Sequence, residues 1–246
     1  MNCIVSACCR TRWLPILLVH LTFSSLAQAQ LQTTPGLKII ATRADFLRSV
    51  KANPKNEMLP LKENIPQLQQ ELIYTTARNF TGKTLYPSIT NTYMRKPAVF
   101  ALQQVQKTLL QQGLGLKIWD AYRPYDATKK MWSIVPDERY AANPKYGSGH
   151  NRGVAVDLTL INISTGKELN MGTGFDHFSD TAHVYFTGLP EQVLENRKLL
   201  QSVMQANGFK VLDTEWWHFY LPESKQYDVL NLSFKQLKKI NQQASH

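Results

Sequence analysis

Four stretches of the chain have the residue pattern of helices. Residues 97–113 (PAVFALQQVQKTLLQQG) have the spacing of an amphipathic helix, with proline in the first turn and glycine at the C-terminal cap. Proline and glycine frame residues 189–208 in the same way, which predicts a long helix. Pro124 opens a further predicted helix that reaches residue 135, and a short one ends near Pro54. The pattern therefore places helices along the whole chain.

Short runs between these helices have the composition of strands. They are rich in β-branched and aromatic residues, and glycine, proline and asparagine separate them. Because helices and strands mix without regular βαβ alternation, we expect an α+β fold, a single domain whose mainly antiparallel central sheet is flanked by helices. The predicted strands cover residues 71–76, 114–120, 153–161, 209–212, 215–221 and 227–230.

The first residues have the pattern of an export signal. Arg10 and Arg12 precede the apolar stretch WLPILLVHLTFSSL, and Ala27-Gln28-Ala29 is a small-x-small cleavage site. This stretch is too short and too interrupted for a membrane-spanning helix. We therefore expect residues 1–29 to be a signal peptide, the protein to be exported to the periplasm, residues 30–65 to be an N-terminal extension, and residues 66–246 to be the main domain.

The positions of the cysteines limit the possible metal ligands, and the distribution of charge limits the possible binding partners. All three cysteines precede residue 10, so a metal site in the exported chain would depend on histidine and carboxylate ligands. The formal net charge is +10, but lysine and arginine are spread along the chain without a dense block. This distribution argues against nucleic acid and is compatible with attraction to an anionic wall polymer. No later apolar stretch predicts a membrane anchor.

Four residues near the middle and end of the chain could form a catalytic zinc site. His150, Asp157 and His218 make a set of three ligands, and Glu215 is left as a base for a zinc-bound water. Spacing does not settle the role of Glu215, because residues three apart in a strand point to opposite faces. Read singly, Asp157 could be a hydrogen-bonded polar residue of a strand, and His218 a member of an aromatic cluster.

Taken together, the motifs point to one enzyme family. SGHNRGVAVDLTL and EWWHFY resemble the pattern Ser-x-His-x-x-Gly-x-x-x-Asp, followed by Glu-x-x-His, of the VanX-type D-alanyl-D-alanine dipeptidases. These are zinc peptidases related to the D-Ala-D-Ala carboxypeptidases. The resemblance spans residues 70–222 and includes YTTARNFTGK, WDAYRP, TGKELNMGTGFDHF and NRKLLQSVMQANGF. It implies one zinc ion per chain, bound on the central sheet of a dipeptidase domain at residues 66–246.

The resemblance also implies individual roles for eight residues. It implies that His150, Asp157 and His218 are zinc ligands and that Glu215 is the catalytic base. It implies that Arg123 stabilises the developing negative charge and that Asp176 binds the substrate ammonium. It also implies that Tyr74 and Ser148 contact the substrate. From composition alone, Arg123 could instead form a surface ion pair with Asp120 or Asp126. His177 and His183 fill no ligand position.

The expected activity is zinc-dependent hydrolysis of the small dipeptide D-Ala-D-Ala to two D-alanines, in cell-wall turnover or salvage. One alternative is a peptidoglycan carboxypeptidase or endopeptidase that uses the same zinc site. Asp176 argues against it, because a stem peptide has no free amine near the scissile bond. Another alternative is a non-catalytic, zinc-stabilised wall-binding module, which would require neither Glu215 nor Arg123.

Overall fold

The computed structural model describes residues 36–244. The predicted signal peptide, its cleavage site and the cysteines lie outside the described residues. Residues 36 onward belong to one compact unit, so the described part of the predicted N-terminal extension packs with the rest. Between residues 36 and 244, no helix is both long enough and apolar enough to cross a membrane.

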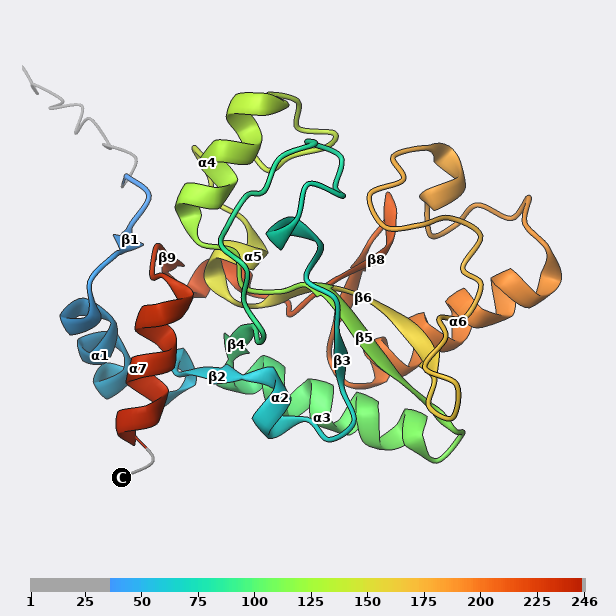
Figure 1. Ribbon diagram of the computed structural model, residues 1–246, viewed down its shortest axis with the longest axis horizontal. Helices are drawn as coiled ribbons and strands as arrows, with labels where there is room; N and C mark the ends of the chain where they lie inside the picture. Colours follow the sequence, from blue (N-terminus) through green and yellow to red (C-terminus); the bar gives the residue numbers. More distant parts are fainter. Residues whose placement is uncertain (1–35, 245–246) are drawn as a thin grey trace, which may run out of the picture. The chain divides into compact units, whose positions relative to one another are not determined.

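A five-stranded sheet with the order β3-β5-β6-β8-β7 forms the centre of the fold (Figure 1). Only the short edge pair β3 and β5 is parallel, and the other neighbours are antiparallel. The mainly antiparallel α+β prediction is therefore confirmed. The strands are β3 (Gln69–Gln70), β5 (Leu114–Asp120), β6 (Ala155–Asn162), β7 (Lys210–Leu212) and β8 (Glu215–Tyr220).

Two long helices, α3 (Lys96–Leu110) and α6 (Glu191–Ala206), pack on one face of this sheet. Both predicted helices are confirmed, each with its proline at the start. Alternate residues of β6 point toward them, and Leu158 is fully buried there. Because side chains alternate across a strand, the intervening Asp157 faces the opposite side of the sheet.

That opposite side carries α4 (Tyr125–Ile134) and α5 (Gly149–Arg152), together with long loops (Figure 1). The prediction of α4 is confirmed, whereas the four-residue α5 lies where a loop was expected. One of these loops, residues 163–190, follows the end of β6 and includes Asp176. This face therefore has both polar strand residues and loops able to enclose them.

Smaller elements close one end of the unit. Strand β1 pairs with β9 near the C-terminus, and β2 pairs with β4, so residues 39–60 are joined to two later parts of the chain. The C-terminal helix α7, rich in lysine and glutamine, was not predicted. The remaining elements are β1 (Ile39–Ile40), α1 (Arg43–Ala52), η1 (Pro54–Asn56), β2 (Met58–Pro60), α2 (Leu61–Asn64), η2 (Ile73–Thr75), β4 (Tyr93–Arg95), η3 (Asp180–Ala182), η4 (Ser224–Gln226), β9 (Val229–Leu230) and α7 (Phe234–Ala244).

The prediction of a strand at residues 71–76 is wrong, because Ile73–Thr75 form one turn of 3₁₀ helix, η2. The hydroxyls of Thr75 and Thr76 donate hydrogen bonds to the carbonyls of Leu72 and Ile73, at 2.6 and 2.9 Å. Such local bonds from side chain to backbone compete with the ladder of a sheet. The turn directs Tyr74 toward the polar face of the sheet instead of along a strand.

Candidate metal and substrate site

Three neighbouring strands bring Asp120, Asp157 and His218 into one row. Asp157 of β6 is paired with His218 of β8 on one side and with Asp120 of β5 on the other. An irregularity in β5 between Ile118 and Asp120 shifts the register, so that Asp120 and not the residue before it lies opposite Asp157. The sheet register thus places two carboxylates and an imidazole side by side.

The short helix α5 supplies His150 to this row. Ser148 caps the helix in a capping box with Asn151, and Gly153 ends it in the left-handed conformation with φ of 73°. His150 Nδ1 lies 2.8 Å from the carbonyl oxygen of Ala121. A carbonyl can only accept, so Nδ1 carries the proton and Nε2 presents its lone pair to the row.

The nitrogen and carboxylate atoms converge closely enough to hold a metal ion. His150 Nε2 lies 3.3 Å from Asp157 Oδ2, and His218 Nδ1 lies 2.9 Å from Asp157 Oδ1. One ligand atom from each of His150, Asp157 and His218 can be chosen so that all lie within 4.8 Å of one another. Among the described residues, no other group of three or more was found that could hold a metal.

The electrostatics of the three residues fit a divalent cation. Burial and the nearby Asp120 charge raise the pKa of Asp157 well above its usual value, so its carboxylate lacks sufficient compensation from the protein alone. Burial lowers the pKa of His150 and of His218, which keeps both imidazoles in the neutral form that ligates metals. Two imidazoles and one carboxylate are the kind of donor set that zinc accepts, and three protein ligands leave a position for water.

Glu215 lies beside this cluster although strand alternation alone would turn it away. The pairing of β7 with β8 is irregular: Val211 pairs with Phe219, but the next residue, Leu212, pairs with Glu215. This irregularity brings Glu215 Oε2 to 3.8 Å from His218 Nδ1. Burial raises the pKa of Glu215 to about 7, close to the value that suits a general base at neutral pH.

Arg123 is buried and held by Asp120. Its Nε and Nη2 lie 2.9 and 2.7 Å from Asp120 Oδ2, and Nη2 reaches within 4.0 Å of Asp157 Oδ2. The ion pair with Asp120 that composition suggested therefore exists, but in the interior and not on the surface. Asp126, the other suggested partner, pairs with Lys129. Arg123 thus brings a fixed positive charge to the edge of the candidate metal site.

The sequence suggested Asp120 only as a surface partner of Arg123, and it did not predict that Asp120 is buried in the site or that Tyr86 bonds to it. Asp120 is fully buried, and the Tyr86 hydroxyl donates to its Oδ1 at 2.8 Å while its Oδ2 accepts from Arg123. The position of Asp120 three residues before Arg123 in WDAYRP was a usable signal. Tyr86 offered none, because its approach depends on a distant loop.

Asp176 and Tyr74 form a second polar pair near the cluster. The Tyr74 hydroxyl lies 3.1 Å from both carboxylate oxygens of Asp176, and the Arg123 guanidinium lies over the Tyr74 ring at 4.7 Å. Asp176 has a φ of 57°, which is uncommon outside glycine and typical of constrained sites. Burial, followed by the Asp157 charge, raises its pKa well above the usual range. The carboxylate is therefore suited to a ligand that brings a positive charge.

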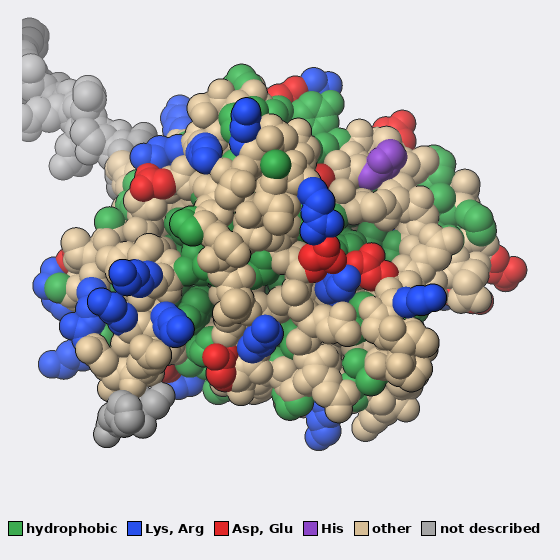
Figure 2. Space-filling model, in the orientation of Figure 1, with side chains coloured by type: hydrophobic (Ala, Val, Ile, Leu, Met, Phe, Trp, Pro, Cys, Tyr) green, Lys and Arg blue, Asp and Glu red, His purple; other side chains and the backbone are tan. Residues whose placement is uncertain are grey.

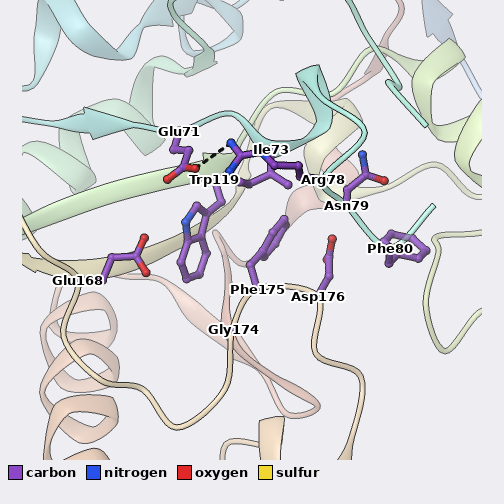
Figure 3. Close-up of a pocket in the computed structure, with 10 residues that line it drawn as sticks. All are labelled: Glu71, Ile73, Arg78, Asn79, Phe80, Trp119, Glu168, Gly174, Phe175 and Asp176. Carbon is purple, nitrogen blue, oxygen red and sulfur yellow. Dashed lines mark hydrogen bonds and ion pairs between the residues drawn. The ribbon is translucent and has the colours of Figure 1, made fainter. Parts of the chain in front are cut away.

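A cavity of about 490 Å³ adjoins Asp176. Figure 3 shows Asp176 and Phe175 on one side of this cavity, with Trp119 next to Phe175. The Trp119 and Phe175 rings stack at 5.2 Å between centroids. Glu71 and Arg78 form an ion pair at 3.2 Å on the far wall. The cavity thus gives Asp176 a polar and aromatic neighbourhood suitable for a small ligand.

Comparison with known proteins places the chain in a family. The peptidase family M15 model described as D-Ala-D-Ala dipeptidase matches residues 54–239. The chain belongs to this family. Its membership makes the protein a peptidase and agrees with the resemblance drawn from the motifs.

Several relatives of the M15 dipeptidase family are similar over most of their length. The D-alanyl-D-alanine dipeptidase of Escherichia coli K12 is 38% identical over 174 residues, which cover 71% of this chain and 89% of the relative. That of Streptomyces coelicolor is 34% identical, covering 68% and 92%. That of Enterococcus faecalis is 31% identical, covering 71% and 96%. A solved LdcB LD-carboxypeptidase aligns with 64% of this chain and 67% of its own, at 22% identity and a TM-score of 0.36.

The remaining predicted residues of this M15 peptidase fall in three different settings. The Ser148 oxygen accepts the Asn151 N–H at 3.1 Å, so the structure gives it a capping role, and its contact with substrate stays a prediction. His177 is exposed. His183 is half-buried, and neither it nor His177 belongs to the His150, Asp157 and His218 group.

Proposed function

We propose that this M15 peptidase hydrolyses D-Ala-D-Ala to two D-alanines with one zinc ion per chain, held by His150, Asp157 and His218. The observation that carries the proposal is the half-buried Asp176 carboxylate near this ligand set, whose pKa is raised by burial and by the Asp157 charge and whose protein partner is the neutral Tyr74 hydroxyl. Four relatives that are 30–38% identical over 65–71% of this chain are D-alanyl-D-alanine dipeptidases, which supports the same substrate.

In this proposal Asp176 and Tyr74 bind the free α-ammonium of the dipeptide. A charge-assisted hydrogen bond to a carboxylate is among the stronger polar contacts, and it is strengthened in a buried site. A peptide that is acylated at this amine has no charge to offer and leaves Asp176 uncompensated. The pair therefore selects free dipeptides over the ends of longer stem peptides.

Bound zinc would supply a Lewis acid that polarises the scissile carbonyl and lowers the pKa of the attacking water. Glu215 takes a proton from that water as its oxygen attacks the carbonyl carbon. Arg123 stabilises the negative charge that develops on the carbonyl oxygen. Glu215 then returns the proton to the leaving nitrogen as the C–N bond breaks, so that one water is consumed and two free amino acids leave.

The place of the reaction follows from the proposed signal peptide at residues 1–29. An exported enzyme meets dipeptides released from the wall more readily than the cytoplasmic pool that feeds wall precursors. We therefore assign the activity to wall turnover or D-alanine salvage in the periplasm. The proposal includes no membrane anchor and no nucleic acid partner.

The test compares two substrates with the zinc-loaded protein: free D-Ala-D-Ala, and a tripeptide with an acylated N-terminus that ends in D-Ala-D-Ala. Release of D-alanine from the dipeptide alone is the expected result. Release from the acylated tripeptide would replace the proposal with a wall carboxypeptidase.

Asp176→Asn provides the matched variant. It keeps the size and the Tyr74 contact but removes the charge, so KM for D-Ala-D-Ala should rise by about 10- to 100-fold, the range of a lost charged hydrogen bond. An unchanged KM would rule out Asp176 as the partner of the ammonium. If neither substrate is cleaved with zinc bound, the endopeptidase and the wall-binding module become the descriptions to test.

A further inference from the structure

A second and larger cavity lies on the other side of Tyr86 from the metal cluster. Its volume is about 960 Å³, and it is lined by residues 85–91, by the start of α4 and by the start of α7. Pockets that bind small molecules in proteins span roughly 300 to 1,000 Å³. The cavity is therefore large enough for a ligand bigger than the dipeptide, and the proposed reaction makes no use of it.

One part of the wall of this cavity is apolar and fixed by packing. Leu85, Tyr93 and Phe234 line it and are each more than nine-tenths buried. The Phe234 ring lies 5.1 Å from the Tyr86 ring and 6.5 Å from the Tyr93 ring, between centroids. Aromatic rings held against one another in this way have little freedom to collapse into the space. The cavity thus has a preformed apolar wall.

Lysines provide most of the charge at this cavity. Lys130, Lys235 and Lys238 line it, and each is exposed. Neither Lys235 nor Lys238 makes an ion pair within residues 36–244. Lys130 donates to the Thr84 carbonyl at 2.6 Å, which leaves its charge uncompensated. On the face shown in Figure 2, Lys and Arg side chains gather over the region of α7, and hydrophobic side chains show beside them.

The two carboxylates at the cavity do not balance these lysines. Asp126 pairs with Lys129 at 2.8 Å and accepts a hydrogen bond from Asn231 at 2.9 Å. Glu63 accepts a hydrogen bond from Asn91. The three lysines at the cavity therefore lie near two carboxylates only. Of these, Asp126 is already neutralised by Lys129, and Glu63 is hydrogen-bonded to Asn91. The excess of positive charge makes an anion the complementary ligand.

We propose that this cavity binds a small soluble acid whose flat or ring-shaped apolar body lies against Phe234 and Tyr86 while its acidic group meets Lys235 and Lys238. The size of the cavity, its aromatic walls and its unbalanced lysines each select for one part of such a ligand. The site is separate from the dipeptide site, and its occupation can be measured without any assay of peptidase activity.

The test uses two fluorescent probes that have the same aromatic body. One is 1-anilinonaphthalene-8-sulfonate, which carries an acid, and the other is neutral N-phenyl-1-naphthylamine. The folded protein should bind the sulfonate saturably and more tightly than the neutral probe. Equal affinity for the two probes, or no saturable binding, would overturn the proposal.

Charge-reversal variants test the position of the acidic group. The double variant Lys235→Glu and Lys238→Glu should bind the sulfonate about tenfold more weakly or worse, because two nearby attractions become repulsions. Lys239→Glu is the matched control, since Lys239 is an exposed lysine of the same helix that does not line the cavity. An equal loss in the control would show general charge attraction and refute the site.

A filling variant tests the apolar part. Ile89 lines the cavity and is half-buried, so Ile89→Trp should occupy the space and weaken binding of both probes. Folding of this variant is checked by its far-UV circular dichroism and thermal transition. If Ile89→Trp fails to fold, the lysine variants alone decide. Undiminished binding by folded Ile89→Trp would place the probes elsewhere.

Discussion

Replacing Glu215 with glutamine should change how the stability of the metal-free protein depends on pH. Burial raises the pKa of Glu215 from 4.5 to about 7 in the folded protein. A raised pKa means that the contribution of this group to stability is fully present below the unfolded value and is lost as the pH rises through the folded value. The rise in the pKa of Glu215 from 4.5 to about 7 corresponds to about 3 kcal/mol in the free energy of unfolding. Because glutamine does not titrate, the variant lacks this pH-dependent contribution.

The assay is urea unfolding of both proteins in the presence of a chelator, between about pH 5 and about pH 9. The free energy of unfolding of Glu215→Gln, measured relative to the original protein, should increase by about 3 kcal/mol across this range. His150 and His218 also titrate on unfolding, but they are present in both proteins, so their contribution largely cancels in the difference. Glu195→Gln, at an exposed site on α6, is the matched control and should show no such trend.

A constant difference between Glu215→Gln and the original protein at every pH would refute the reasoning. It would mean that Glu215 is solvated in the folded state and that its pKa is ordinary. The same variant, loaded with zinc, should also lose most of its turnover of D-Ala-D-Ala, because glutamine cannot accept the proton. Near-normal turnover with zinc bound would exclude Glu215 as the base.

Three further substitutions test the site and its support. Arg123→Lys should lower kcat/KM for D-Ala-D-Ala by about 100-fold, because an ammonium cannot reproduce the guanidinium fork, and a steady-state assay at unchanged zinc content measures this. Gly153→Ala should cost about 1–3 kcal/mol and weaken zinc retention against a chelator, since the φ there is 73° and a Cβ would lie 2.7 Å from Met58 Sδ. Leu158→Ala should cost about 2–5 kcal/mol in urea unfolding, because Leu158 is fully buried between the sheet and the helices. A loss under about 1 kcal/mol for Leu158→Ala would contradict that packing.

The parts of the fold that could be predicted are those with strong local signals. Helices α3 and α6 have an apolar face framed by proline and glycine, and both form. Strand β6 has a largely apolar run that contains one charged residue, and it becomes a buried strand with that residue, Asp157, on the site face. Helix α5 around His150 was not predicted, although its capping residue and its terminal glycine both lie within the motif.

The features that could not be predicted from the sequence depend on the pairing of strands and loops that are far apart in the chain. Glu215 meets His218 only because the pairing of β7 and β8 is irregular, which depends on two strands at once. Asp120 joins the row only through an irregularity in β5, and Tyr86 reaches it from a separate loop. The turn at Ile73–Thr75 was missed because hydroxyl-to-carbonyl bonds outweighed strand propensity.

The row formed by Asp120, Asp157 and His218 has a consequence for the proposed binding of a metal. A slip of one residue in any of these three strands would turn its member of the row to the opposite face. His150 and His218 are 68 positions apart, so the unfolded chain has no preassembled set of ligands. Binding of the proposed zinc ion would therefore require β5, β6 and β8 to be paired in their native register, and retention of zinc against a chelator would report that register.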